Sequence, residues 1–413
     1  MMQELFEKAL GIQEPWYVKE LQFDPEAKKL DISIDFHKGA LFDYVDARSG
    51  REYVGLKAYD TTQKRWRHLN FFEHECYLHA RVPRIKLPEG KVRTVKTPWE
   101  GLSQGFTLLF EALLMQLASS MPVRSVAGLT GTRDDKLWEM LDRYIEQTRV
   151  HEDFAEMEAI GMDETSQTKG HSYITLFVDM VQRRTIYVTE GKSARTLKDF
   201  RENFETHKGN IEQIRHVSCD MSPAFIKGVE ETLPNAHITF DKFHILKVIN
   251  KAVDEVRKAE VRGQPLLKGT KYIWLKNRTN LTQKQKKTLQ QLSISKLNLK
   301  TSRALRIRES FQEIYTAQSQ EEFVLLLKKW YFWATHSRLE PIKQAARTIK
   351  NHWEGIVAWF ESRINNGILE GLNSLIQAAK AKARGYRTFR NYRIIVYLLT
   401  GKLDFSKVNA HIR

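Results

Sequence analysis

Three acidic residues occupy positions where a carboxylate could help to bind a metal ion. Asp163 follows a short apolar stretch, Asp220 follows another, and Glu370 lies on the polar side of a predicted helix. Carboxylate oxygens are ligands that Mg²⁺ prefers, and a pair of such ions can activate a nucleophile and stabilise the leaving oxygen in phosphodiester cleavage. We therefore expect the three acids to form one site for Mg²⁺ or Mn²⁺.

Other polar residues near these acids have simpler interpretations. Asp241 also ends a predicted strand and is a fourth candidate ligand. Glu164 follows Asp163 directly, so it points to the opposite face if the strand continues. Asp179 ends another strand and is typical of a turn. His244 could donate to a phosphate or to an acid, although a single histidine is more often structural.

The charge of the chain favours a polyanionic partner. The 413 residues include 66 Lys and Arg against 50 Asp and Glu, a net charge of +16. Residues 245–310 hold 17 basic and 4 acidic residues, and residues 371–413 hold 9 basic residues and one acid, Asp404. A solvated basic surface and a membrane surface are alternatives. Two basic segments flanking the acids favour nucleic acid, bound with a strong salt dependence.

Few residues suggest a secreted or membrane protein. The two cysteines, Cys76 and Cys219, cannot build a disulfide framework or a cysteine-rich metal site. The first residues do not resemble a secretory signal, and no run of about 18 apolar residues is present. We expect a soluble cytoplasmic protein that does not bind membranes.

The first 150 residues predict two parts. Alternating apolar residues punctuated by Gly and Pro predict a β-rich module over residues 1–100. Residues 101–150 predict three helices, the second with Pro122 at its first position and the third capped by Thr132 with Asp135 as capping-box partner. Such a segment is compatible with a DNA-binding helix-turn-helix or with an ordinary helical linker.

Residues 151–244 alternate strands with helices. We expect a first strand ending at Asp163, two further strands, a helix, a strand ending at Asp220, a helix, and a strand ending at Asp241. This order is that of a ribonuclease-H-like α/β layer. The acids would then lie near the carboxyl ends of neighbouring strands.

The rest of the chain reads as helical. Residues 245–364 predict a basic all-helical segment, in which the aromatic-rich stretch 323–333 favours a helical core over base stacking. In the last part, 365–413, Glu370 opens a helix that Gly385 ends, followed by a basic tail. Asn373 and Gln377 share the face of Glu370, because they lie three and seven residues further along.

Three blocks of sequence contain these acids: MDETSQTKGHSYITLFVD (162–179), HVSCDMSPAFIKGVEETLPNAHITFDKFHILK (216–247) and SRINNGILEGLNSLIQAAKAKARGYRTFRNYR (362–393). Together they resemble the DDE transposases of the ISL-three insertion-sequence family of bacteria, and residues 64–99 resemble the N-terminal region of that family. The resemblance implies that Asp163, Asp220 and Glu370 are the catalytic and metal-binding triad. It also implies a helical insertion over about 245–364 and an activity in DNA transposition.

The chain departs from the family at one point. Many relatives carry zinc-binding Cys and His pairs in the N-terminal module, whereas the matching positions here are Asp46, Ser49, Leu87 and Gly90. None of these can supply a thiolate ligand, so we expect no structural zinc.

The resemblance also implies partners. The protein would bind double-stranded DNA, both the terminal inverted repeats of the element and target DNA, as a homodimer or higher synaptic complex. A catalytically silent DNA-binding descendant and a metal-dependent nuclease are the alternatives. The cations expected to contact DNA are Arg133, Lys136 and Arg143 on the third helix, and Lys380, Lys382, Arg384, Arg387 and Arg390 near the C-terminus.

Overall fold

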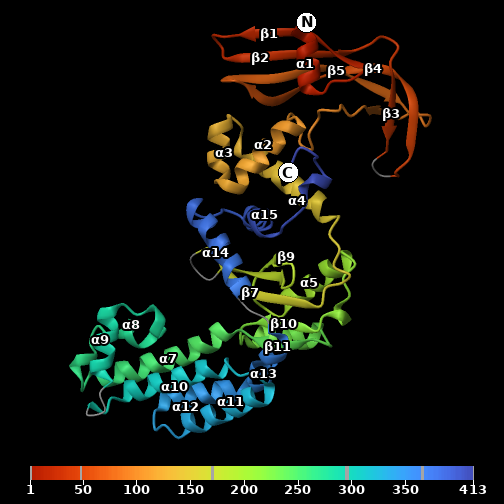
Figure 1. Ribbon diagram of the computed structural model, residues 1–413. Helices are drawn as coiled ribbons and strands as arrows, with labels where there is room; N and C mark the ends of the chain where they lie inside the picture. The colour runs from red at the N-terminus through yellow and green to blue at the C-terminus, as the bar shows by residue number, and fades with distance from the viewer. Residues whose placement is uncertain (1, 47–48, 169–171, 294–296, 364–366, 413) are drawn as a thin grey trace. The chain divides into compact units, whose positions relative to one another are not determined.

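The computed structural model describes residues 2–46, 49–168, 172–293, 297–363 and 367–412 (Figure 1). The chain forms two compact units, the first from residues up to Glu152 together with those from Ala378, and the second from Asp153–Gln377. His171 and residues 365 and 366, which belong to predicted elements, lie outside the described residues. None of the helices in the described ranges is both long and apolar enough to cross a membrane.

The first unit contains a six-stranded sheet with the order β1-β2-β5-β4-β3, and β6 pairs with β5. The alternating pattern predicted here buries one face, where Ile32, Trp66 and Leu78 are almost fully enclosed. The helix α1 (Met2–Leu10) precedes the sheet and was not predicted. The strands are β1 (Trp16–Asp24), β2 (Lys29–Phe36), β3 (Leu41–Val45), β4 (Glu52–Phe71), β5 (His74–Lys86) and β6 (Val92–Thr94).

Three helices follow: α2 (Leu108–Ser120), α3 (Val123–Thr130) and α4 (Asp134–Arg149). Two details of the prediction are wrong. Pro122 is the N-cap of α3 rather than its first residue. Thr132 does not cap α4, because Arg133 is the N-cap residue. The carboxylate of Asp135, expected to complete a capping box with Thr132, pairs instead with the Arg133 guanidinium.

The C-terminal segment folds into the same unit. The part after Gly385, expected to be a tail, contains the helix α15 (Phe389–Thr400), which packs against α2 and α4. Arg390 donates to Asp142 on α4. The buried Glu111 accepts the Tyr144 hydroxyl, to which the Asn409 amide also donates, so the C-terminal residues are tied to the helical core.

The second unit contains a five-stranded sheet with the order β11-β10-β7-β8-β9. Strands β7, β8 and β9 are antiparallel, whereas β10 and β11 run parallel to β7. The elements are β7 (Ala159–Thr168), β8 (Ser172–Asp179), β9 (Arg184–Glu190), α5 (Arg195–Thr206), β10 (His216–Cys219), α6 (Pro223–Thr232) and β11 (His237–Phe240).

One strand boundary differs from the prediction. β7 does not end at Asp163 but continues to Thr168, with Asp163 opposite Leu176 of β8. The apolar pattern stops at Asp163, but backbone hydrogen bonds to the antiparallel neighbour extend the strand through the polar residues that follow. Asp163 therefore lies within a strand, where its backbone is fixed on both sides.

A helical region continues the second unit, as predicted. Phe323 and Trp330 are buried in its core, but Phe332 and Trp333 are 65% and 43% exposed, so the aromatic-rich helix is only partly a core element. Its helices are α7 (Lys242–Val261), α8 (Lys271–Leu275), α9 (Gln283–Leu292), α10 (Lys300–Ile314), α11 (Gln320–Thr335), α12 (Glu340–Asn351) and α13 (Trp353–Ser362). The helix α14 (Gly367–Lys382) follows and contributes residues to both units.

Candidate catalytic site

The register of the second sheet brings the first two acids together. Ser218 of β10 pairs with Gly161 of β7, and the strands are parallel. Asp220 lies two residues after Ser218, and Asp163 lies two residues after Gly161. Neighbouring strands are about 4.8 Å apart, so the two aspartates lie side by side at the point where β10 ends and β7 continues.

Asp241 extends this row by one strand. Cys219 of β10 pairs with Phe240 of β11, so Asp220 and Asp241, each the next residue, are also neighbours. Asp241 is buried, whereas Asp163 and Asp220 are partly buried. Three carboxylates on three adjacent parallel strands therefore line one edge of the sheet.

The electrostatic environment of Asp163 reflects this crowding. The pKa of the Asp163 carboxyl is raised to about 6, first by burial and to a smaller extent by the charges of Asp220 and Asp241, while the backbone N–H of Glu164 and the charge of His244 act in the opposite direction. The pKa of Glu164 is also raised, first by burial and then by Asp220. A cation bound at this edge would relieve the repulsion between the carboxylates.

Both oxygens of Asp163 have hydrogen-bond donors. Oδ1 accepts the backbone N–H of Glu164 at 2.8 Å, and Oδ2 accepts the amide Nδ2 of Asn373, which lies on α14. One turn further along α14, Gln377 donates to the hydroxyl of Thr165 in β7. These two amides attach the polar side of α14 to the strand that carries Asp163.

The apolar side of α14 packs against the same strand at Gly161. A Cβ atom at Gly161 would lie 2.5 Å from the Met180 sulfur and 3.0 Å from Leu369 Cδ2. Leu369 forms a small buried cluster with Val178 and Met180. Only a residue without a side chain therefore allows α14 to approach β7 this closely.

Glu370 is carried by this helix and its side chain is exposed. It precedes Asn373 by three residues, which places the two side chains on the same helix face, about 5–6 Å apart at Cβ. The Oδ1 atom of Asn373 is buried and has no hydrogen-bond partner. Among the described residues, no three His, Cys, Asp or Glu side chains are close enough to hold a metal ion. The structure brings Asp163 beside Asp220 and docks the helix of Glu370 on the strand of Asp163, but the exposed Glu370 side chain does not complete a set of three ligands among the described residues.

Asp241 and His244 form a pair that sequence analysis considered only as separate residues. Oδ1 of Asp241 accepts the backbone N–H of Phe243, and Oδ2 bonds to Nδ1 of His244 at 2.8 Å. The bond to Asp241 raises the pKa of His244, and the charges of Asp163 and Asp220 raise it further. An Asp three residues before a His, at a predicted helix start, was the signal that could have identified this pair.

Asp179 behaves as predicted. It ends β8, and its Oδ1 accepts the backbone N–H groups of Val181 and Gln182, at 2.8 and 2.9 Å, which closes the turn before β9.

The cations predicted to contact DNA all belong to the first unit. Arg133 is paired with Asp135, Lys136 lies 3.7 Å from Glu139, and Arg143 donates to the Leu102 carbonyl. Lys382 donates to the Ser120 carbonyl at 2.8 Å. Their role in DNA binding stays a prediction, as does that of Lys380, Arg384 and Arg387.

The structure shows other contacts at two of the positions that the resemblance matches to zinc ligands, Asp46 and Leu87. Asp46 accepts hydrogen bonds from both the backbone N–H and the hydroxyl of Ser49, which closes a polar turn. Leu87 is buried in the core of the first sheet.

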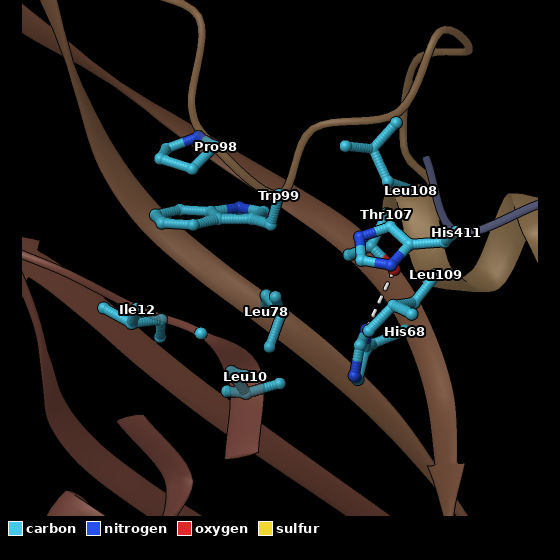
Figure 2. Close-up of a pocket in the computed structure, with 11 residues that line it drawn as sticks. Leu10, Ile12, His68, Leu78, Pro98, Trp99, Thr107, Leu108, Leu109 and His411 are labelled. Carbon is cyan, nitrogen blue, oxygen red and sulfur yellow. Dashed lines mark hydrogen bonds between the residues drawn. The ribbon is translucent and has the colours of Figure 1, made fainter. Parts of the chain in front are cut away.

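A cavity of about 180 Å³ lies in the first unit, lined mainly by apolar side chains together with His68, Thr107 and His411 (Figure 2). Nδ1 of His68 bonds to the Thr107 hydroxyl, and burial lowers the pKa of His68 to about 4. None of the carboxylates of the catalytic candidate lines this cavity.

Comparison with known families decides the class of the protein. Residues 160–396 match a family model described as "Transposase", and residues 95–145 match one described as "Helix-turn-helix domain of transposase family ISL3". The chain belongs to the ISL3 transposase family. The first match contains the whole row of acids and α14, and the second contains α2 and α3 and most of α4. The second match favours the helix-turn-helix interpretation of this segment over an ordinary linker.

Characterised relatives have the same class of function. The chain is 29% identical over 345 residues to the transposase for insertion sequence element IS1001 of Bordetella parapertussis, covering 80% of this chain and 83% of that protein. It is 26% identical over 360 residues to the transposase for insertion sequence element IS1557 of Mycobacterium tuberculosis, covering 79% of each. The chain is thus an insertion-sequence transposase with a DNA-binding helix-turn-helix domain.

The residues of the site fit a divalent cation, the kind of ion that DDE transposases generally use. Asp163 and Asp220 are neighbours in the strand register, and their adjacent negative charges favour a cation. Asn373, whose Nδ2 donates to Asp163, has a buried Oδ1 atom without a hydrogen-bond partner, which is a further candidate oxygen ligand. Hard oxygen ligands of this kind suit Mg²⁺ or Mn²⁺.

Proposed function

We propose that this ISL3-family protein binds the terminal inverted repeats of an insertion sequence, cleaves DNA at the ends of the element and joins them to target DNA. Asp163, Asp220 and Glu370 are the catalytic carboxylates in this proposal. They lie on a ribonuclease-H-like sheet and on α14, with residues 245–364 as a helical insertion between the second and third acids.

The observation that carries the proposal is the hydrogen bond from Asn373 to Asp163. It connects the helix of Glu370 with the strand of Asp163, although Asn373 and Asp163 are 210 positions apart in the chain. The strand register independently supplies Asp220 as the neighbour of Asp163. These two contacts support a shared location for Asp163, Asp220 and the helix that carries Glu370.

Different residues of the site would bind the cations and orient the carboxylates. Asp163, Asp220 and Glu370 would hold the divalent cations, and Asn373 would fix the orientation of the Asp163 carboxylate. Bound cations supply activation of the attacking hydroxyl and stabilisation of the leaving oxygen in phosphodiester chemistry. Water would be the nucleophile for cleavage, and the freed 3′ hydroxyl would be the nucleophile for strand transfer.

The remaining parts would recognise DNA. The β-rich module of residues 1–100 and the helix-turn-helix segment of residues 101–150 would bind the repeats, with Arg133, Lys136 and Arg143 at the base edges or backbone. Residues 151–244 and 365–413 would supply the catalytic core and its basic end. Lys380, Lys382, Arg384 and Arg387 would contact phosphates. We propose that the protein works in the bacterial cytoplasm as a homodimer or higher synaptic complex, since two element ends must be joined.

The test is cleavage of labelled repeat DNA in Mg²⁺ by the full chain and by Asp163→Asn. The variant should bind DNA with unchanged affinity and lose cleavage by about 100- to 1,000-fold, as expected when a group that stabilises the transition state is removed. Asp199→Asn on α5 is the matched control, because that carboxylate lies on a helix and makes only a 3.9 Å contact with Arg195.

Three outcomes would contradict the proposal. Undiminished cleavage by Asp163→Asn would exclude its catalytic role. Binding of repeat DNA by the wild-type chain without any cleavage in Mg²⁺ or Mn²⁺ would favour a silent DNA-binding protein. Hydrolysis without joining of a pre-cleaved end would favour a nuclease.

A further inference from the structure

We propose that His244 is a further catalytic residue, which donates its Nε2–H to a non-bridging oxygen of the scissile phosphodiester, and that Asp241 is the residue that positions it. This inference rests on the proposed function, because it assigns a substrate contact within the same site. It makes Asp241 an orienting group rather than a fourth metal ligand.

The contacts of Asp241 connect it to His244. One oxygen accepts the backbone N–H of Phe243 at 2.8 Å, and the other bonds to His244 at 2.8 Å. The carboxylate is buried and lies next to Asp220 in the strand register. A buried carboxylate that bonds directly to a ring nitrogen is suited to fixing an imidazole, as in other acid–histidine pairs.

The pairing also defines what His244 can do. An ionised carboxylate only accepts, so Nδ1 of His244 must donate to Asp241, and Nε2 is the nitrogen left for a ligand. The His244 side chain is 27% exposed, whereas Asp241 beneath it is 8% exposed. Solvent, and therefore a substrate, can reach the His244 ring but not the Asp241 carboxylate.

The location of the ring indicates a phosphate as the ligand. His244 lies in the first turn of α7, whose N-terminus carries partial positive charge. The ring interacts electrostatically with both Asp163 and Asp220. An Nε2–H donor fixed beside the acids that would hold the cations is suited to a non-bridging oxygen of the phosphodiester bound there.

A purely structural role makes different predictions. If the pair only capped α7, Asp241→Asn would be nearly silent, because asparagine is as good an N-cap as aspartate and keeps the acceptor for Phe243. In our proposal the same change removes the carboxylate that holds the imidazole. Asp241→Asn should therefore leave the melting temperature unchanged but slow cleavage.

The experiment measures single-turnover cleavage of repeat DNA by the full chain at saturating enzyme, with DNA affinity and thermal unfolding as controls. His244→Ala should slow cleavage about 100-fold, the usual cost of removing one transition-state donor. His244→Gln, which keeps a donor near the Nε2 position, should recover about tenfold of this loss, and Asp241→Asn should cost about tenfold. His207→Ala is the matched control, a half-exposed histidine whose Nδ1 bonds to the Asn203 carbonyl on α5; it should stay within about twofold.

A second readout separates contact with substrate from a structural effect. The two phosphorothioate isomers at the scissile position each replace one non-bridging oxygen by sulfur, a poorer hydrogen-bond acceptor. The wild-type chain should cleave one isomer slowly in both Mg²⁺ and Mn²⁺, and this difference should disappear in His244→Ala. An unchanged difference in His244→Ala, or full cleavage activity in that variant, would overturn the inference.

The outcomes also distinguish this inference from the function on which it rests. If Asp163→Asn is inactive while His244→Ala cleaves at the wild-type rate, the catalytic triad stands and only the role of His244 fails. If Asp163→Asn cleaves normally, the proposed function itself fails.

Discussion

Replacing Asp163 by asparagine should make the metal-free protein more stable while removing its response to Mg²⁺. The pKa of this carboxyl is about 6 in the folded chain, against 3.8 for an ordinary aspartate. A carboxyl whose pKa is raised by folding binds its proton more tightly in the native state. It therefore favours folding only while protonated, and that contribution is lost as the pH rises through about 6.

The size of the effect follows from this difference. About two pKa units correspond to about 3 kcal/mol of unfolding free energy lost above pH 7, and about half of this is already lost at pH 5. Because Asp163 is only partly buried, solvent screening makes these values upper bounds. Asparagine carries no charge at any of these pH values. In the variant, the Asn373 amide can flip, so that its Oδ1 atom, which has no hydrogen-bond partner in the wild type, accepts a hydrogen bond from the amide of the introduced asparagine.

The assay is urea unfolding in EDTA and in Mg²⁺, followed by hydrogen exchange of peptides from the second unit, so that only the unit containing Asp163 is read. In EDTA, Asp163→Asn should exceed the wild type by up to about 3 kcal/mol at pH 7.5 and by about half of that at pH 5. Mg²⁺ should stabilise the wild type but not the variant. The reasoning is refuted if the variant is less stable in EDTA at pH 7.5, or if Mg²⁺ stabilises both proteins equally.

Three further predictions concern the same site. The apparent affinity for Mn²⁺, measured by isothermal titration, should be constant above pH 7. It should fall as the pH drops through about 6, because Asp163 becomes protonated. An affinity that does not change between pH 7.5 and 5 would exclude Asp163 as a ligand. Gly161→Ala should cost about 1–3 kcal/mol of unfolding free energy and slow cleavage, because the new Cβ would meet Met180 and Leu369 and displace α14. The control is Gly128→Ala, since a Cβ at Gly128 would have nothing within 4 Å. Equal effects of the two substitutions would contradict the close packing at Gly161. Asn373→Leu should weaken Mn²⁺ binding about tenfold in the same titration, as for other groups that orient a ligand, whereas unchanged binding would mean that Asn373 does not orient Asp163.

The sequence pattern predicted the elements of the second unit well, because strands and helices there carry clear periodicities and turn residues. It also identified Asp179 as a turn residue. It placed the end of β7 too early, at Asp163, because pairing with β8 continues after the apolar residues stop. A single strand's pattern does not contain the hydrogen bonds that its neighbour offers.

The pattern of apolar and polar residues could not predict contacts between segments that are distant in the chain. Nothing local indicates that Asn373 bonds to Asp163, or that Gly161 is the point where Leu369 approaches the sheet. The capping box at Thr132 was a reasonable local choice, but the ion pair of Arg133 with Asp135 competed with it. Hydrophobicity alone likewise could not separate the buried Trp330 from the exposed Trp333 in one helix.

The central claim is that Asp163, Asp220 and Glu370 share divalent cations. The most direct measurement is an anomalous difference map from crystals of the full chain soaked in Mn²⁺. The account predicts a peak in bonding distance of carboxylate oxygens from Asp163 and Asp220, with Glu370 turned toward it from α14. Manganese bound elsewhere only, or a Glu370 carboxylate that remains in solvent beside an occupied pair of aspartates when repeat DNA is also bound, would contradict it.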